Sequence, residues 1–165
     1  MSYDWDGEAK REGGGSVADP IPATERTTLL VVRAIYERKD GTSFTSQKGD
    51  PQVFLVFQDS EGREAAQMYT LSEAAGWTIA KLVDAMDPDL LAELKRLDIH
   101  PVDFVEPEVL KTWLMTPAAS GQADSRGTFF EASVRYEPRK ADPTKKDPRI
   151  TPLRREPEPD DDIPM

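Results

Sequence analysis

Hydrophobic and polar positions in the middle of the chain follow the two-residue period of β-strands. Residues 27–38 (TTLLVVRAIYER) are rich in β-branched and apolar side chains, and the length of this run predicts one long strand with room for a bulge. Residues 52–58 (QVFLVFQ) predict a strand that is apolar on both faces, and residues 63–70 predict its hairpin partner after a turn at 59–62. A last strand is predicted at 128–136 (TFFEASVRY).

The spacing of apolar residues changes to that of helices after residue 71. One buried helical face is predicted to consist of Ile79, Leu82, Val83 and Met86. A second helix is predicted after Asp87-Pro88, with an apolar stripe formed by Leu90, Leu91, Leu94 and Leu97. A third, short helical piece is predicted at 107–115. The pattern therefore predicts a mainly β fold of the α+β class, with a helical insert at about 72–115.

Composition separates a folded middle from two irregular ends. Only 38% of the 165 residues are apolar, against roughly 45–50% in an ordinary globular domain. Residues 1–25 contain three consecutive glycines and few aliphatic side chains, which predicts a flexible arm. The chain after Tyr136 is rich in proline and charge. We therefore expect one folded domain at 26–136 and a disordered tail at 137–165.

Charge is sorted along the chain. The sequence has 21 basic and 31 acidic side chains, a net charge of −10, and residues 26–136 alone contain 12 bases and 17 acids. Residues 139–155 contain seven bases and two acids, whereas residues 156–165 contain five acids and no base. The predicted tail is therefore a basic linker that ends in an acidic tip.

The last six residues combine acids with a large apolar terminus. They are Asp160, Asp161, Asp162, Ile163, Pro164 and Met165. This tip resembles that of bacterial single-stranded DNA-binding proteins (SSBs), which ends Asp-Asp-Asp-Ile-Pro-Phe, with Met165 in place of phenylalanine. The resemblance implies docking to replication, recombination and repair proteins through a hydrophobic pocket ringed by bases. The alternative is a plain solubilising tail, which has no need for Ile163-Pro164-Met165 at the terminus.

The predicted order of elements carries a second resemblance. Proteins with this tip usually contain an oligonucleotide/oligosaccharide-binding (OB) barrel. The long first strand, hairpin, helical insert and last strand resemble a phage-encoded family of small SSB-like proteins, whose last strand carries Gly-x-x-Phe, here Gly127-Thr128-Phe129-Phe130. The resemblance implies an OB-like five-stranded barrel or partly open sheet. Members of the SSB family often assemble several OB folds, so a homo-oligomer is an open alternative.

Single-strand binding needs basic side chains interleaved with aromatic rings on which bases stack. Alternation places Arg33 on the strand face of Leu29 and Val31, and places Tyr36 and Arg38 on the other face. We expect Phe54, Phe57 and Phe130 in the core, whereas stacking and core roles are equally compatible with Tyr36, Tyr69 and Phe44, the aromatic of a polar loop. The candidate nucleic-acid-binding residues are Arg33, Tyr36, Arg38, Lys39, Phe44, Lys48, Arg63, Tyr69, Arg126 and Arg135.

Other kinds of site find little support. The chain has no cysteine and a single histidine, His100, so we expect no metal site and no cofactor. It contains no P-loop, no G-x-S-x-G motif and no G-x-G-x-x-G after a strand, so an enzyme is not expected. No apolar run approaches the roughly 18 residues of a membrane span, and the first ten residues do not form a secretory signal. We therefore expect a cytoplasmic protein, in the bacterial nucleoid or a phage-infected cell.

The leading hypothesis is a non-catalytic SSB with an OB-like core. It would coat single-stranded DNA during replication, recombination or repair and recruit partner enzymes through residues 160–165. One alternative is an adaptor or decoy that uses the tip to bind SSB partners and binds no DNA, which the acidic domain favours. Another is an acidic mimic of DNA, although the sharpest acidic cluster is terminal rather than spread over a surface.

Overall fold

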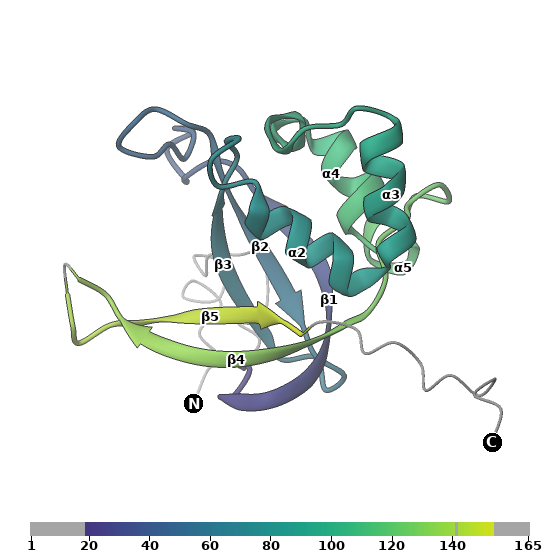
Figure 1. The fold of residues 1–165 in the computed structure, drawn as a ribbon. Helices are drawn as coiled ribbons and strands as arrows, with labels where there is room; N and C mark the ends of the chain where they lie inside the picture. Colours follow the sequence, from purple (N-terminus) through teal and green to yellow (C-terminus); the bar gives the residue numbers. More distant parts are fainter. Residues whose placement is uncertain (1–18, 141, 154–165) are drawn as a thin grey trace, which may run out of the picture.

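The computed structural model describes residues 19–140 and 142–153 (Figure 1). Five antiparallel strands form one open sheet in the order β3-β2-β1-β4-β5. The strands are β1 (Thr24–Ile35), β2 (Gln52–Gln58), β3 (Glu64–Thr70), β4 (Phe130–Pro138) and β5 (Lys146–Pro152). A helical insert between β3 and β4 comprises α2 (Trp77–Met86), α3 (Pro88–Arg96), the 3-10 helix η1 (Pro101–Val105), α4 (Pro107–Leu114) and α5 (Pro117–Ser120). The predicted mainly β fold with a helical insert is confirmed.

Strand β1 is the centre of the sheet and contains a bulge. Its second half pairs with β2 and its first half pairs with β4. The pairing with β2 shifts register between Val31, which lies opposite Phe57, and Arg33, which lies opposite Val56. The extra residue reverses the alternation of side chains. Arg33 is therefore on the exposed face of β1, and its predicted position on the face of Leu29 and Val31 is wrong.

Strands β2 and β3 form a hairpin with an apolar inner face. Val53, Leu55 and Phe57 of β2 are fully buried. On the other face of the hairpin, Phe54 lies directly opposite Met68 of β3, and both side chains are only partly buried. The hairpin therefore has one face in the core and one face available to solvent.

The core lies between the sheet and the helical insert. The Phe57 ring meets the Phe130 ring edge to face at 5.7 Å, so the predicted core positions of these two residues are confirmed. Leu82 and Met86 of α2 and Leu114 of α4 are fully buried in the same cluster. The four-leucine stripe predicted for the second helix is only partly buried. Its members Leu90 and Leu94 are buried, Leu91 is partly buried and Leu97 is 44% exposed.

The start of the chain belongs to the fold earlier than the predicted flexible arm 1–25 implies. Ile21 is 1% exposed, and the Tyr136 hydroxyl donates a hydrogen bond to its carbonyl. Pro20 bridges to Glu64 of β3, and β1 begins at Thr24. Burial of the Ile21 side chain explains why residues 19–25 are ordered against the sheet. Residues 1–18 of the predicted arm lie outside the described residues.

The predicted disordered tail at 137–165 is wrong for its first part. Strand β4 continues to Pro138, and β5 covers 146–152 with Ile150 buried in the core. Strand β5 is at the edge of the sheet and pairs only with β4, so only its backbone N–H groups on that side are needed as donors. Pro148 and Pro152, which lack an N–H group, are therefore tolerated in β5. The described part of the basic segment therefore forms the turn and the second strand of the β4–β5 hairpin. Residues 154–165, including the acidic tip, lie outside the described residues.

Strands β3 and β5 approach each other without forming a ladder. The Ile150 N–H donates a 2.6 Å hydrogen bond to Oε1 of Gln67, whose side chain projects from β3. This side-chain bond takes the place of a backbone pair, so the sheet curves round but stays open along this seam. In the part of the chain that the structure describes, no helix is long and apolar enough to cross a membrane.

Gly127 provides a test of how the helical insert packs on the sheet. A Cβ atom at this position would lie 2.5 Å from the backbone carbonyl carbon and oxygen of Leu114 at the end of α4. We expect Gly127→Ala to destabilise the protein by about 2–3 kcal/mol, since the backbone must move apart. Urea unfolding of both proteins measures this difference.

Gly121→Ala is the matched control. Gly121 has φ of 71°, and no atom lies within 4 Å of its added Cβ, so only the left-handed backbone opposes alanine. We expect Gly121→Ala to lower the free energy of unfolding by about 1 kcal/mol. Equal losses in the two variants would contradict the close approach of Gly127 to α4.

Candidate nucleic-acid interface

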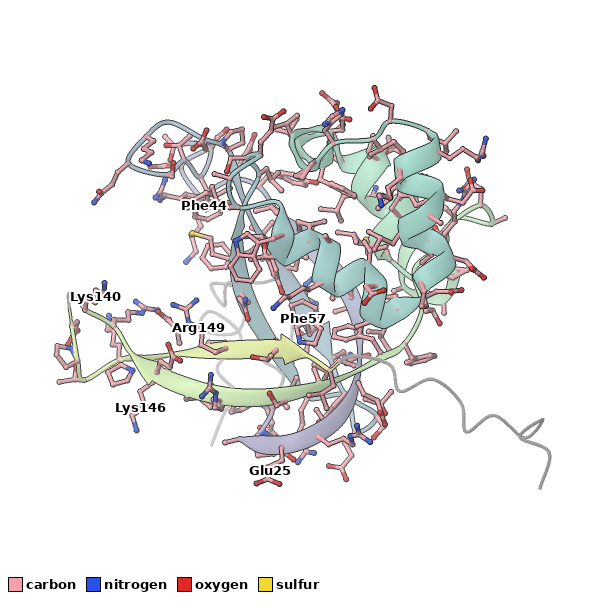
Figure 2. The ribbon with its side chains drawn as sticks, viewed as in Figure 1. Glu25, Phe44, Phe57, Lys140, Lys146 and Arg149 are labelled. Carbon is pink, nitrogen blue, oxygen red and sulfur yellow. The ribbon has the colours of Figure 1, made fainter. Side chains whose placement is uncertain are left out.

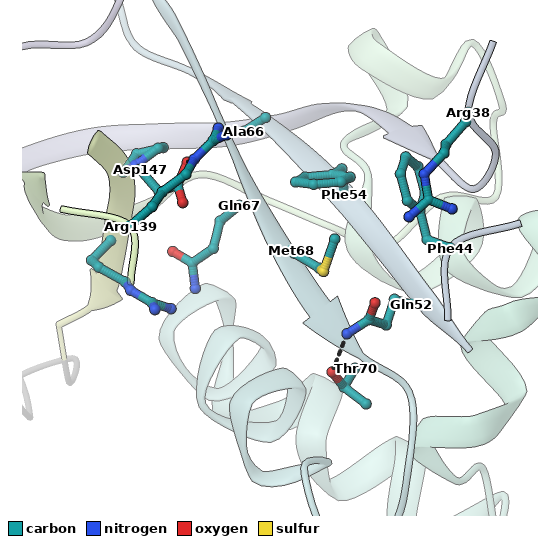
Figure 3. A pocket seen from close by; sticks show the side chains of 12 residues that line it. Arg38, Phe44, Gln52, Phe54, Ala66, Gln67, Met68, Thr70, Arg139 and Asp147 are labelled. Atoms are coloured by element: carbon teal, nitrogen blue, oxygen red, sulfur yellow. Dashed lines mark hydrogen bonds and ion pairs between the residues drawn. The ribbon is translucent and has the colours of Figure 1, made fainter. Parts of the chain in front are cut away.

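A groove of about 520 Å³ crosses the exposed face of β2 and β3. One wall is the connection between β1 and β2, and the other is the β4–β5 hairpin (Figure 3). The floor is made by side chains that alternate with the core residues of the two strands. The β4–β5 hairpin therefore meets the β1–β2 connection and the β2–β3 hairpin, which are distant from it in sequence, at one surface.

The floor of the groove combines an apolar centre with a polar edge. The side chains of Phe54 and Met68 form a directly opposed cross-strand pair. Next to them, Nε2 of Gln52 donates a 3.0 Å hydrogen bond to Oγ1 of Thr70. The apolar surface suits the face of a planar ring such as a nucleic-acid base, and the amide and hydroxyl groups beside it can hydrogen-bond to the edge of that ring.

The wall that follows β1 adds an aromatic ring and a cation. The Phe44 ring packs edge to face on Phe54, with centroids 4.9 Å apart. The guanidinium carbon of Arg38 lies 4.8 Å from the centroid of the Phe44 ring. Phe44 is half-buried and fixed by backbone bonds, since its N–H donates to Tyr36 and its carbonyl accepts from Gln52. The structure therefore presents two rings and a cation together.

Both walls contain the same kind of tight turn, an aspartate followed two residues later by a threonine. Asp40 accepts hydrogen bonds from the N–H and the hydroxyl of Thr42, and Asp142 accepts the same two bonds from Thr144. The threonine hydroxyl, followed by its N–H, holds the pKa of each aspartate below its ordinary value. Both turns are therefore fixed best when the aspartates are ionised.

The hairpin wall contains several basic side chains, of which the arginines form ion pairs and the lysines do not, among the described residues. Arg139 forms a 2.8 Å ion pair with Asp147, and Arg149 forms a 3.1 Å ion pair with Glu137. Figure 2 shows Lys140 and Lys146 at the outer end of the hairpin. Among the described residues, no carboxylate lies within 4.0 Å of the ammonium groups of the following exposed lysines: Lys48, Lys140, Lys145 and Lys146.

Four of the predicted site residues belong to the wall that follows β1. Arg38 and Phe44 line the groove. Lys39 and Lys48 are exposed in the same connection, on either side of Phe44. The structure therefore brings these four candidate residues together in one loop, where bases lie on either side of an aromatic residue.

Two predicted arginines make ion pairs away from the groove. Arg33 bonds Glu64 of β3 at 2.6 Å, although its side chain is still 58% exposed. Arg63 bonds the buried Asp59 at 2.7 Å in the turn between β2 and β3. Burial opposes ionisation of Asp59, but the Arg63 guanidinium and two backbone N–H groups outweigh it and lower the pKa of Asp59. Arg63 is therefore engaged in fixing the turn.

The two tyrosines among the candidate residues, for which core and stacking roles were both open, pack against the core, and Tyr69 is too buried for its ring to stack on a base. Tyr69 is 3% exposed and its ring packs 6.3 Å from that of Phe57. Tyr36 is half-buried, and its hydroxyl donates a 2.8 Å hydrogen bond to the Phe104 carbonyl. Burial raises the pKa of both phenols, and the charge of Glu106 adds to the shift at Tyr36. Both remain neutral tyrosines.

The remaining two candidates lie elsewhere on the surface. Arg126 stacks over the Trp113 ring at 4.3 Å and lies 3.6 Å from a carboxylate oxygen of Glu93 on α3, so it belongs to the helical insert. Arg135 is exposed on β4, directly opposite Arg149 of β5. Arg126 is thus separate from the groove, whereas Arg135 continues the basic face of the hairpin.

Several groove residues escaped the sequence prediction. Phe54 was expected in the core, but it alternates with Val53 and Leu55 and is the ring on the exposed face. Arg139 and Arg149 were assigned to a disordered tail. The signal that locates them is the buried Ile150 flanked by polar residues, which marks a short edge strand.

In the described ranges 19–140 and 142–153, no group of three or more histidine, aspartate or glutamate side chains is placed to hold a metal ion. His100 makes a 3.0 Å contact with Asp98 in the helical insert. The predicted docking residues 160–165 lie outside the described residues, so the candidate interface consists of the groove alone.

The two buried tyrosines provide a paired test of these positions. The Tyr69 hydroxyl is buried with no hydrogen-bond partner among the described residues. We expect Tyr69→Phe to leave the free energy of unfolding unchanged or to raise it by up to about 1 kcal/mol. Tyr36→Phe should instead lower it by about 1 kcal/mol, because the bond to Phe104 is lost. Urea unfolding distinguishes the two. A larger loss for Tyr69→Phe would contradict the unpartnered hydroxyl.

The sequence matches no protein-family model, and no curated protein matches it. The groove on β2 and β3, with its two rings and its basic walls, is therefore the basis for assigning a function.

Proposed function

We propose that this protein binds single-stranded DNA without catalysis and recruits other proteins through its acidic C-terminal tip. One observation carries the proposal. The Phe44 and Phe54 rings, the Arg38 guanidinium and the basic β4–β5 hairpin line one groove. Unspecific single-strand binding uses aromatic rings for base stacking and a basic track for phosphates.

The connectivity of the sheet supports an OB-like fold. Strand β1 pairs with both β2 and β4, the helices lie between β3 and β4, and β3 approaches β5 through the Gln67 bond. OB-folds are partly open five-stranded barrels that bind oligonucleotides on strands 2 and 3, between the loops that join strands 1 to 2 and 4 to 5. The groove lies in the corresponding place.

The groove offers separate partners to each part of a nucleotide. Phe44 and Phe54 present apolar ring surface to a base, and the amide of Gln52 and the hydroxyl of Thr70 present donors and acceptors to a base edge. Arg38 and the lysines of the two walls present positive charge to phosphates. The rings accept any base, so the binding should depend little on sequence.

The C-terminal tip supplies the recruitment part of the proposal. Residues 160–165 combine three aspartates with Ile163, Pro164 and Met165, and residues 153–159 join them to the end of β5. The aspartates would steer the tip to a basic rim on a partner, and the apolar residues would enter its pocket. Candidate partners are the replication, recombination and repair proteins that bind SSB tips.

One observation favours a second candidate function, that of an adaptor or decoy that binds SSB partners and no DNA. The domain is acidic, and carboxylates already pair with Arg33, Arg139 and Arg149. A net negative domain weakens attraction for phosphates. This candidate differs from the first in predicting no single-strand binding even at low salt.

Titration with fluorescent oligonucleotides at about 50 and 200 mM salt tests the proposal. We expect saturable single-strand binding that weakens with salt, and weaker binding to duplex. Phe44→Leu and Phe54→Leu should each weaken single-strand binding by about tenfold, because leucine keeps apolar packing but lacks a stacking face.

Phe129→Leu is the matched control, because Phe129 is a 57% exposed ring outside the groove. The Phe129→Leu variant should bind single-stranded DNA with the same affinity as the unaltered protein. If the full chain and a chain lacking residues 156–165 both fail to bind single strands at the lower salt, the adaptor function replaces this one. Equal effects of all three substitutions would refute the groove as the stacking site.

Deletion of residues 160–165 separates the two proposed activities. We expect the shortened protein to lose capture of purified proteins that bind SSB tips, since its apolar end and three aspartates are gone. Its affinity for single strands should stay the same or increase, because negative charge has been removed. Surface plasmon resonance and the oligonucleotide titration measure the two activities. Loss of DNA binding on deletion would contradict the assigned role of the tip.

A further inference from the structure

The exposed face of the β4–β5 hairpin carries alternating arginine and carboxylate side chains, here named the hairpin ladder. Strand β4 contributes Arg135 and Glu137, Arg139 directly follows it, and β5 contributes Asp147 and Arg149. The register places Glu137 directly opposite Asp147 and Arg135 directly opposite Arg149. Like charges in directly opposed positions destabilise a sheet, so the directly opposed pairs do not account for this arrangement.

Each carboxylate of the hairpin ladder bonds an arginine diagonally rather than directly across. Oδ1 of Asp147 accepts from Nε of Arg139 at 2.8 Å, and Oε2 of Glu137 accepts from Nε of Arg149 at 3.1 Å. Oε1 of Glu137 lies 3.9 Å from Nη2 of Arg135. All five side chains remain between 46% and 70% exposed. The ladder is therefore ordered and open to solvent.

The use of Nε leaves most of each guanidinium available. An arginine side chain has five N–H donors, of which four belong to the two Nη groups. In the described part of the chain, the Nη groups of Arg139 and Arg149 make no hydrogen bond, so each presents a pair of donors outward. Such a pair matches two oxygens of a phosphate.

We propose that the hairpin ladder is a binding site for the sugar–phosphate backbone, in which Glu137 and Asp147 hold the arginines and also compete with phosphate for them. The inference rests on the proposed single-strand binding and adds a site distinct from the stacking rings. Three arginines and two carboxylates give this face a net charge of +1. The carboxylates therefore limit the affinity of the site while fixing its geometry.

Amide substitutions separate the two roles of the carboxylates. Glu137→Gln and Asp147→Asn keep a side-chain oxygen that accepts from Nε, but each removes one negative charge. If phosphate approaches the ladder, each should raise the affinity for single strands about two- to fivefold at 50 mM salt, which is the size of an exposed charge interaction. Arg139→Gln and Arg149→Gln should each lower the affinity and reduce the slope of log K against log salt by about 0.7.

Glu131→Gln is the matched control for the change in net charge. Glu131 also lies on the exposed face of β4, where it is 3.4 Å from Arg26 of β1, and it does not line the groove. Its amide should leave the affinity within about twofold of the unaltered protein. Thermal unfolding followed by circular dichroism confirms that each variant is folded before its binding is compared.

The probes are a mixed-sequence single strand and an abasic strand of equal length, which has phosphates but no bases. The ladder substitutions should change the binding of both strands, whereas Phe44→Leu should affect only the strand with bases. If the ladder variants bind both oligonucleotides with the same affinity as Glu131→Gln, the inference is overturned, whereas the proposed stacking groove is unaffected. Binding of neither strand by the unaltered protein would refute the proposed function itself.

Discussion

The bulge in β1 is the constraint on which the rest of the structure depends. One extra residue between Val31 and Arg33 reverses which side chains face the core. It also lies near the point where β1 changes its partner from β4 to β2, so that the sheet bends around the shared core. The bend brings the β4–β5 hairpin up to β3, where Gln67 bonds Ile150.

The groove gathers aromatic and basic side chains on a protein whose net charge is negative. Its arginines are held by neighbouring carboxylates on β4 and β5, which keeps the hairpin ordered and its charge low. Exposed lysines at the hairpin end and Lys48 in the opposite wall supply charge without such partners among the described residues. Affinity in this account comes from the Phe44 and Phe54 rings as much as from phosphate contacts, with a strong dependence on salt.

Much of the fold could be predicted from the sequence, because long strands and helices leave clear periods. The second and third strands and the helical insert were located within a few residues. The strand face on which Arg33 lies was predicted wrongly, because no local sequence signal marks the bulge. One extra residue moves every later side chain of the strand to the opposite face. Strand β5 was hidden by its prolines and charges, with Ile150 as its only core residue. Phe54, expected in the core, lies on the exposed face, and Tyr69, for which core and stacking roles were both open, is buried, since alternation alone does not say which face of a strand is buried.

Photo-crosslinking tests the central claim most directly, because it locates a bound strand on the protein. A single strand that carries 5-iodouracil would be irradiated with the full chain at low salt, and the attached peptides identified by mass spectrometry. We expect crosslinks at Phe44 and Phe54, which lie on one wall and on the floor of the groove. Crosslinks confined to the helical insert, or saturable binding with no crosslink to either ring, would contradict the central claim.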